Sequence, residues 1–189
     1  MISNNLAIAL LHYPVYNKRR EVVTTALTNL DLHDIARSAR TYGLERFYII
    51  NPAAGQRDLA ERITDHWRAG WGAAYNPDRK DALDIVRICE TLEVAVNDFQ
   101  RGFANRVKSV ITGATERPGN ISFAECKEML GKSDDPFLLL LGTGWGLTEE
   151  CFNNADYILK PITGPGAYNH LSVRSAAAIM LDRLRGMQQ

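Results

Sequence analysis

Two glycine-rich segments near the carboxyl end of the chain are the first candidates for binding chemistry. LLLLGTGWGL places a glycine at every second position from Gly142 to Gly146, and TGPGAY places Gly164 and Gly166 around a proline. Glycine lacks a side chain, so backbone N–H and C=O groups can approach a flat ligand there. Each segment follows an apolar run, so we expect two loops that form one ligand slot. A tight turn without a ligand is the alternative.

Neither glycine segment matches a nucleotide-binding fingerprint. A dinucleotide loop needs G-x-G-x-x-G in the first βαβ unit and an acidic residue about twenty positions later. Here the third glycine comes one position too early for this spacing. The segment also lies late in the chain instead of in a first βαβ unit. A phosphate loop requires Gly-Lys-Ser/Thr, which Leu147 and Thr148 do not supply. Thr148 is instead a candidate N-cap with Glu149 and Glu150 in the first turn, which favours a neutral or cationic ligand.

Polar residues near the amino end form a second candidate site. His12 ends the first apolar run, and Asn17, Lys18, Arg19 and Arg20 follow as the densest basic cluster. Such a cluster can hold RNA phosphates, although it is more often a solvated loop. His12 has no second metal ligand at helical spacing, so we expect no metal site.

Strand-like and helix-like segments alternate along the chain. This alternation predicts an α/β fold with a mostly parallel, open sheet in three layers and one domain over residues 1–189. Short apolar runs predict strands at Leu6–His12, Arg46–Asn51, Glu93–Asp98, Ser109–Ala114, Phe137–Gly142 and Tyr157–Ile162. Periodic stretches predict helices at Asp31–Gly43, Gln56–Gly72, Arg79–Leu92 and Leu171–Arg185. Trp67 and Trp71 in the second helix are expected as core or subunit-interface anchors, with base stacking as the alternative.

Composition narrows the class of protein. The chain has 189 residues, and its 22 basic and 22 acidic side chains give zero formal charge, which argues against binding through a global field. The three cysteines, Cys89, Cys126 and Cys151, match neither a disulfide framework nor a zinc site and indicate reduced thiols. No run reads as a signal peptide or approaches membrane-spanning length, so a cytoplasmic protein without membrane attachment is expected.

Three segments together resemble the α/β-knot (SPOUT) RNA methyltransferases. LLLLGTGWGL, YILKPITG and YNHLSVRSAAAIMLDRL match the order of the family's carboxyl-terminal knot, here approximately residues 137–185. DLHDIARSARTYG resembles the phrase that follows the first strand in the family's ribose methyltransferases, with Arg37 in register. With LLHYPVYNK, the whole chain resembles a bacterial subgroup of stand-alone members.

The resemblance implies a trefoil knot, S-adenosylmethionine as cofactor, an RNA substrate and a homodimer. By this resemblance, one side of the cofactor is held by backbone groups of Leu141, Gly142, Thr143 and Gly144. The adenine pocket is formed by Pro161, Ile162 and Gly164, and it is closed by His170, Leu171 and Ser172.

Arg37 and Ser172 are the implied residues of the methyl-acceptor side. A guanidinium stays protonated, so Arg37 is expected to hold an acceptor phosphate or stabilise alkoxide charge, unless it only pairs with Asp34 or Glu45. His12, His33 and Asp34 are secondary candidates. The family's helix phrase has Asn where this chain has Ser172, and Ser where it has Arg174, which leaves ribose or base open as acceptor.

Two other functions fit parts of this pattern. A catalytically silent knot-fold module could bind RNA or a nucleotide, and replacing Arg37 would then impair binding instead of turnover. A nicotinamide-dependent enzyme is disfavoured by the glycine spacing.

Overall fold

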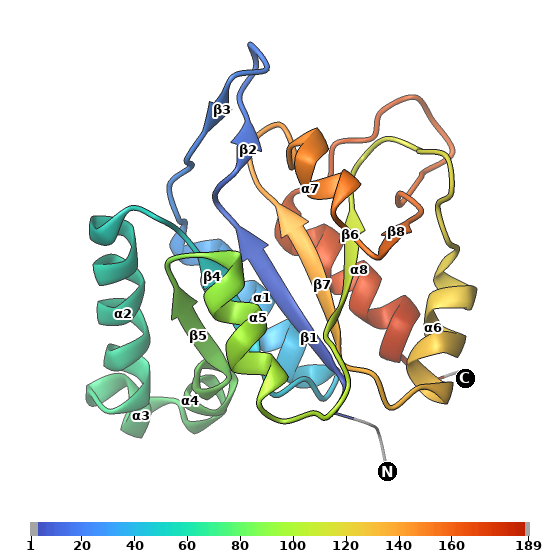
Figure 1. Cartoon of the computed structure of the whole chain (residues 1–189). Coiled ribbons are helices and arrows are strands. Elements are labelled where there is room, and N and C mark those ends of the chain that lie inside the picture. The colour runs from blue at the N-terminus through green and yellow to red at the C-terminus, as the bar shows by residue number, and fades with distance from the viewer. Residues whose placement is uncertain (1–3, 188–189) are drawn as a thin grey trace.

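A computed structural model describes residues 4–187 and contains a six-stranded sheet in which every neighbouring pair is parallel (Figure 1). The strand order is β5-β4-β1-β7-β6-β8. The strands are β1 (Leu6–Leu11), β4 (Phe47–Ile50), β5 (Val86–Cys89), β6 (Lys108–Thr112), β7 (Phe137–Gly142) and β8 (Tyr157–Leu159). A separate antiparallel hairpin pairs β2 (Val15–Tyr16) with β3 (Val22–Val23). The predicted mostly parallel α/β sheet is therefore confirmed.

Helices cover both faces of this sheet (Figure 1). One face packs against α1 and α8, which also contact each other, and the opposite face packs against α5. The helices are α1 (Asn29–Thr41), α2 (Ala54–Arg68), α3 (Trp71–Tyr75), α4 (Pro77–Asp84), α5 (Leu92–Gln100), α6 (Phe123–Lys132), α7 (Glu149–Asn153) and α8 (Val173–Arg185). Helix α1 begins with Thr28 as N-cap and is followed by Gly43 at φ +78°, near the predicted glycine stop.

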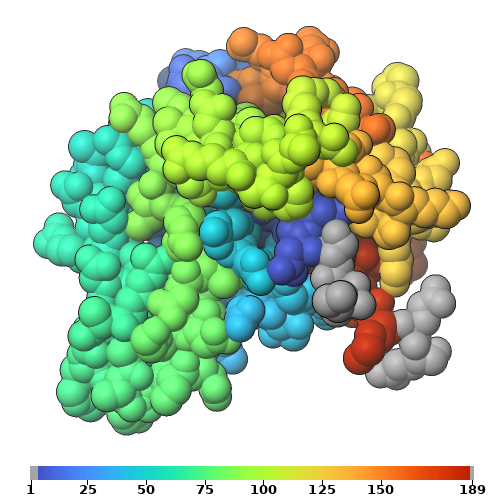
Figure 2. Space-filling model, turned by 60° about the horizontal axis from the view of Figure 1, so that its bottom comes forward, coloured from blue at the N-terminus to red at the C-terminus, as the bar shows by residue number. Residues whose placement is uncertain are grey.

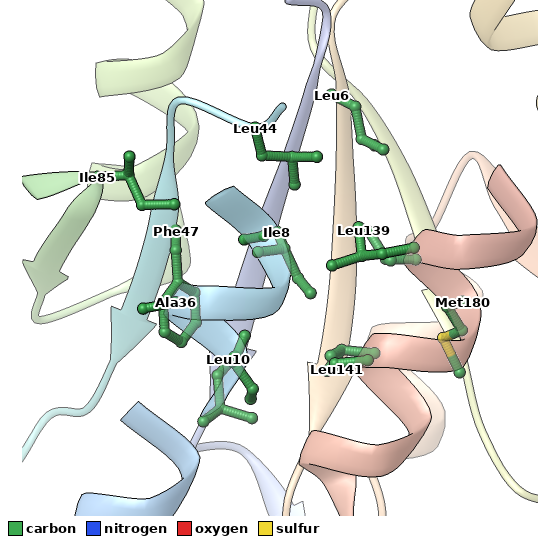
Figure 3. Packing of buried hydrophobic residues seen from close by; sticks show 14 of the residues in the cluster. Leu6, Ile8, Leu10, Ala36, Leu44, Phe47, Ile85, Leu139, Leu141 and Met180 are labelled. Atoms are coloured by element: carbon green, nitrogen blue, oxygen red, sulfur yellow. The ribbon is translucent and has the colours of Figure 1, made fainter. Parts of the chain in front are cut away.

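Strands β1 and β7 form the centre of the core because both of their faces are buried. Ile8 and Leu10 belong to the cluster under α1 and α8, whereas Ala7 and Ala9 belong to the cluster under α5. Figure 3 shows Leu139 and Leu141 of β7 on the side of α8, which carries Met180. Because each buried leucine contributes about 1.5–3 kcal/mol, these two strands fix the position of the carboxyl-edge loops firmly.

The predicted strand at Glu93–Asp98 is wrong, because this segment lies in helix α5. Thr91 caps the helix by accepting a hydrogen bond from the Val94 N–H at 3.3 Å. Ala95 and Phe99 lie four residues apart on the buried side, while Val94 is half-exposed. The local alternation of apolar and polar residues therefore concealed a helical period.

The predicted helix at Arg79–Leu92 is also wrong in its second half. Helix α4 ends at Asp84, and Val86–Cys89 forms the edge strand β5 beside β4. The Arg68 guanidinium donates hydrogen bonds to the carbonyls of Leu83 and Val86, where the chain changes from helix to strand. This distant arginine gives the helix a partner at its end that the local sequence does not reveal.

The predicted helix at Gln56–Gly72 is interrupted after Arg68. A Cβ at Gly70 would lie 2.7 Å from the His66 carbonyl oxygen, so glycine permits the break between α2 and α3. Trp67 packs at the edge of the core, but Trp71 is 71% exposed and stacks on Tyr75. Trp71 is therefore not a core anchor.

Two other expectations concern the thiols and the membrane. All three cysteines are free, and burial raises the pKa of Cys89 and of Cys126 to about 11. Within residues 4–187, no helix is both long and apolar enough to span a membrane.

Candidate functional site

Three strands, and not two, end at the candidate site. The expected ligand slot placed the loops after β7 and β8 side by side, but β6 lies between these strands. Strands are about 4.8 Å apart, so the two loops start roughly 10 Å from each other and the end of β6 lies between them. There the buried Thr112 hydroxyl has no hydrogen-bond partner among residues 4–187. Gly113 follows this strand, a signal that the sequence analysis missed.

The glycine loop after β7 is occupied by the β2–β3 hairpin. The Trp145 N–H donates to the Tyr16 carbonyl, and the Tyr16 N–H donates to the Gly146 carbonyl, each at 2.9 Å. A Cβ at Gly144 would lie 3.0 Å from the same Tyr16 oxygen, and Gly144 has φ +58°. These glycines thus admit a backbone from the protein itself.

Gly142 has a similar internal reason. A Cβ on Gly142 would lie 2.7 Å from Leu147 Cγ and 3.0 Å from the Leu147 backbone nitrogen. Leu147 is buried at the start of α7. The residue at position 142 must therefore be small for the loop to fold back onto the sheet.

A buried chain of hydrogen bonds connects the hairpin to this loop. His12 Nδ1 lies 3.0 Å from Thr25 Oγ1, which lies 2.5 Å from Thr143 Oγ1. The Thr143 hydroxyl also lies 3.2 Å from the Leu11 carbonyl, and the Thr25 hydroxyl lies 3.5 Å from the His12 carbonyl. The His12 Nε2 has no hydrogen-bond partner among the described residues. Burial lowers the pKa of His12 to about 4, opposed by the nearby Asp31 carboxylate.

The loop after β8 differs because its backbone is free. Among residues 4–187, no backbone–backbone hydrogen bond involves residues 161–171. Within residues 4–187, the one side-chain hydrogen bond of this loop is that of the Asn169 amide, which donates to the Ala114 carbonyl at 2.9 Å. A Cβ at Gly164 or Gly166 would meet nothing within 4 Å. Unpaired backbone groups beside empty space fit a cofactor held by main-chain donors and acceptors.

The predicted acceptor-side residues lie where α1 meets α8. Ser172 is the N-cap of α8 and accepts from the Ser175 N–H at 3.3 Å. Arg37 is exposed and borders a groove with Tyr42 and Ser175. It forms no ion pair with any residue of the described part of the chain, so the expected alternative pairing with Asp34 or Glu45 is absent.

Arg174 pairs with Asp34 instead, and with Asp31 as well. Its guanidinium lies 3.5 Å from an oxygen of Asp31 and 3.5 Å from an oxygen of Asp34. His33 lies on the other side of α1, edge-on to Trp67, and burial lowers its pKa. No hydrogen bond or ion pair within the described residues joins His33 or Asp34 to His12.

The basic cluster forms the tip of the hairpin. Asn17 closes the turn, since its Oδ1 accepts from the N–H groups of Arg19 and Glu21 at 2.8 and 3.1 Å. Arg20 lies over the Tyr16 ring at 4.1 Å and 3.6 Å from Glu149. Lys18 and Arg19 are exposed, and within residues 4–187 they form no ion pair.

Glu149 connects three segments at this edge, a contact that the sequence analysis missed. Arg117 donates two hydrogen bonds to its carboxylate at 2.6 and 2.7 Å and holds its pKa below the usual range. Thr148 is the N-cap residue of α7 as predicted, but its hydroxyl donates to Cys151 Sγ instead of capping the helix. The negative charge of Glu149 at the start of α7 is therefore balanced by Arg20 of the hairpin and by Arg117 of the loop after β6.

Curated relatives cover nearly all of this chain. An uncharacterized protein from Aquifex aeolicus is 40% identical over 97% of the chain and 90% of its own length. A tRNA (guanine-N(1)-)-methyltransferase from Oleidesulfovibrio alaskensis is 43% identical over 96% of the chain. The chain spans only 42% of the length of that relative.

A solved structure shares the fold at low sequence identity. The SpoU methyltransferase AviRb from Streptomyces viridochromogenes matches 96% of the chain and 59% of its own, with 15% identity and a TM-score of 0.61. Its complex with the cofactor AdoMet covers 57% of its own chain and gives a TM-score of 0.57. The parallel sheet and its helices therefore match the fold of this SpoU methyltransferase.

A family model decides the classification. The model is described as SAM-dependent RNA methyltransferase, and it matches residues 5–186. This range includes the three strand ends, the hairpin and both glycine loops. The chain therefore belongs to the family of S-adenosylmethionine-dependent RNA methyltransferases.

Proposed function

We propose that this chain methylates tRNA, with S-adenosylmethionine bound across the carboxyl ends of β6, β7 and β8. The free backbone of residues 161–171 is the observation that carries this proposal. The tRNA methyltransferase relative supports tRNA as the substrate class. The bound cofactor supplies an electrophilic methyl group on a sulfonium, so the protein's task is to position and stabilise the reacting groups.

The cofactor residues follow from the two sides of this edge. Main-chain groups after β7 would form one wall, and the open loop after β8 would form the adenine side. The proposed set is Leu141, Gly142, Thr143 and Gly144 on the first side, and Pro161, Ile162, Gly164, His170 and Leu171 on the second. Thr112 adds a buried hydroxyl between them to which no protein group within residues 4–187 bonds.

Arg37 is proposed to act on the acceptor. Its guanidinium is exposed at the α1–α8 groove and has no carboxylate partner within the described residues. It stays protonated, so it would hold a phosphate of the acceptor nucleotide or stabilise negative charge on the acceptor oxygen or nitrogen. The Ser172 hydroxyl at the start of α8 lies 2.9 Å from the hydroxyl of Ser175, which lines this groove. Its hydroxyl is proposed to orient the acceptor nucleotide.

A trefoil knot and a homodimer complete the proposal. Strand β8 lies between β6 and Ile121, since the Ile121 N–H donates to Ile158 O at 2.8 Å and the Lys160 N–H donates to Ile121 O at 2.9 Å. Residues 113–121 therefore pass around β8 before α8 returns to pack on α1 and α6, which supports threading. Leu30 and Leu171 are exposed at the starts of α1 and α8, which suits an apolar contact with a second copy.

Methyl transfer to unfractionated bacterial tRNA tests the proposal. We expect incorporation of labelled methyl groups by the wild-type protein and a loss of about 100-fold or more in the Arg37→Ala variant, because removing one charge-stabilising group costs this much in other enzymes. Cofactor binding by the variant should be unchanged. Light scattering should give the mass of two chains. Absence of transfer by the wild-type protein to any RNA would contradict the proposal.

A further inference from the structure

Trp145 is a large aromatic residue that is exposed to solvent at the candidate site. Its side chain is 58% exposed, although it lies in the loop directly after the buried strand β7. Its backbone is fixed on both sides, because Trp145 N–H and Gly146 O both hydrogen-bond to Tyr16. A fixed backbone under an exposed indole gives a flat apolar surface at low entropic cost.

The two unpaired cations of the hairpin tip are connected to this loop through Tyr16. The Tyr16 backbone bonds to the backbone of Trp145 and Gly146, and Lys18 and Arg19 follow two and three residues after Tyr16 in the chain. Figure 1 shows the hairpin projecting beyond the carboxyl edge of the sheet, with the chain after β7 rising alongside β2. An exposed ring and two free cations therefore occupy the same projection.

Three carboxylates lie in these segments, and only Glu149 is in an ion pair, with Arg117 and Arg20. Glu21 accepts a hydrogen bond from the Asn17 amide at 2.7 Å, and neither Glu21 nor Glu150 forms an ion pair within residues 4–187. The hairpin tip itself, residues 17–21, carries three cations and one carboxylate. This tip therefore favours an anionic partner, although the whole chain has zero formal charge.

We infer that Trp145 stacks on an unpaired base of the RNA substrate while Lys18 and Arg19 hold the adjacent phosphates. Single-stranded RNA is recognised by this combination, since bases stack on aromatic side chains and cations follow the backbone. The inference rests on the proposed function and assigns it an RNA contact beyond the cofactor loops. It places an unpaired base of the RNA next to the glycine loop without using the backbone groups proposed to hold the cofactor.

Trp71 provides a matched control. It is 71% exposed and stacked on Tyr75 with ring centroids 4.8 Å apart, so it is also an accessible tryptophan. It belongs to α3, which lies at the opposite edge of the sheet from the hairpin (Figure 1). The segment of α3 and α4 projects at the lower left of the face in Figure 2, away from the strand ends that form the site.

The test is tRNA binding measured by filter retention, with tryptophan fluorescence as a second readout. Trp145→Ala should raise the Kd for unfractionated tRNA at least about fivefold, since one base–aromatic stack is worth about 1–3 kcal/mol. Trp145→Phe should retain most of the affinity, and Trp71→Ala should leave it unchanged. Quenching of fluorescence by tRNA should be lost in Trp145→Phe and kept in Trp71→Phe. Cofactor binding should be equal in all variants.

The cations are tested by salt dependence. Replacing Lys18 and Arg19 together by alanine should reduce the slope of log K against log salt by about 1.4, at about 0.7 for each single-strand phosphate that the variant no longer neutralises. An unchanged slope would overturn the assignment of these cations.

Other results would place the failure elsewhere. If the wild-type protein methylates tRNA and Trp145→Ala binds it equally well, the stacking inference fails and the proposed function stands. If the wild-type protein neither binds nor methylates RNA, both fail. If Trp145→Ala instead converts a two-chain particle into single chains, Trp145 belongs to an interface between copies and the inference is overturned.

Discussion

The two glycine-bearing loops at the carboxyl edge are similar in sequence and different in structure. A Cβ on Gly142 would lie 2.7 Å from Leu147, and one on Gly144 would lie 3.0 Å from the Tyr16 carbonyl. A Cβ on Gly164 or Gly166 would meet nothing within 4 Å. The first loop also forms backbone hydrogen bonds with the hairpin, while residues 161–171 form none within the described chain.

This difference separates two reasons for glycine in a loop. In the loop after β7, glycine lets two parts of the protein come close, and substitution should affect folding. In the loop after β8, no protein atom among the described residues requires the glycines, so we expect that a ligand does. A glycine-rich loop after a strand therefore indicates a binding site most strongly when its own fold leaves the glycines without neighbours.

Acid should produce the largest effect on the first loop, because it is anchored by the buried His12. The folded-state pKa of about 4 lies below the ordinary value of 6.5, so between these values the unfolded chain binds the extra proton. Stability is therefore full above pH 6.5 and falls toward pH 4, by about 3 kcal/mol in total. Urea unfolding at pH 7 and pH 4.5 measures this loss.

The control for this prediction is His12→Asn, which cannot titrate but can still bond to Thr25. Its stability should depend less steeply on pH, whatever its stability at pH 7. Equal slopes for the two proteins would show that His12 does not contribute and that other groups cause the acid sensitivity.

Substitution of the glycines should change stability by less than acid does, and in opposite directions for the two loops. Gly142→Ala should lower stability by about 1–3 kcal/mol through overpacking against Leu147. At about 2–4 °C for each kcal/mol in a chain of this size, the melting temperature should fall by at least about 2 °C. Gly164→Ala should leave it unchanged or raise it slightly, since a less flexible unfolded chain stabilises the fold by about 0.4–1 kcal/mol. Calorimetry measures the melting temperature of both variants. A lower melting temperature for Gly164→Ala than for Gly142→Ala would contradict the proposed difference between the two loops.

The sequence predicted the central elements well because their signals are local. Four leucines in a row define β7, and the cap and glycine stop define α1. Errors arose where a distant contact decided the structure. Arg68 stabilises the helix-to-strand change near Val86, and the helical burial of Ala95 and Phe99 overrides the alternation around Val94.

The candidate site was predicted in part for the same reason. The glycine-rich loops could be recognised from their sequence, but the segments that lie next to them depend on the order of the strands in the sheet. That order inserts β6 and its Thr112 between them and brings the hairpin onto Gly144. The Arg117–Glu149 pair joins residues 32 positions apart. No local pattern around either residue distinguishes this pair from ordinary surface charges.

Calorimetric titration with S-adenosylmethionine tests the central claim most directly, using the wild-type protein, Gly164→Ala and Gly142→Ala at a temperature where all are folded. We predict binding by the wild-type protein in about the micromolar range, with no heat from NAD, and a Kd raised at least about tenfold in Gly164→Ala. Gly142 is proposed to contact the cofactor through its main chain only, and the added methyl group would face Leu147, so Gly142→Ala should bind more nearly like the wild-type protein once folded. Binding to Gly164→Ala that is as tight as to the wild-type protein would contradict the claim that the open loop after β8 holds the cofactor.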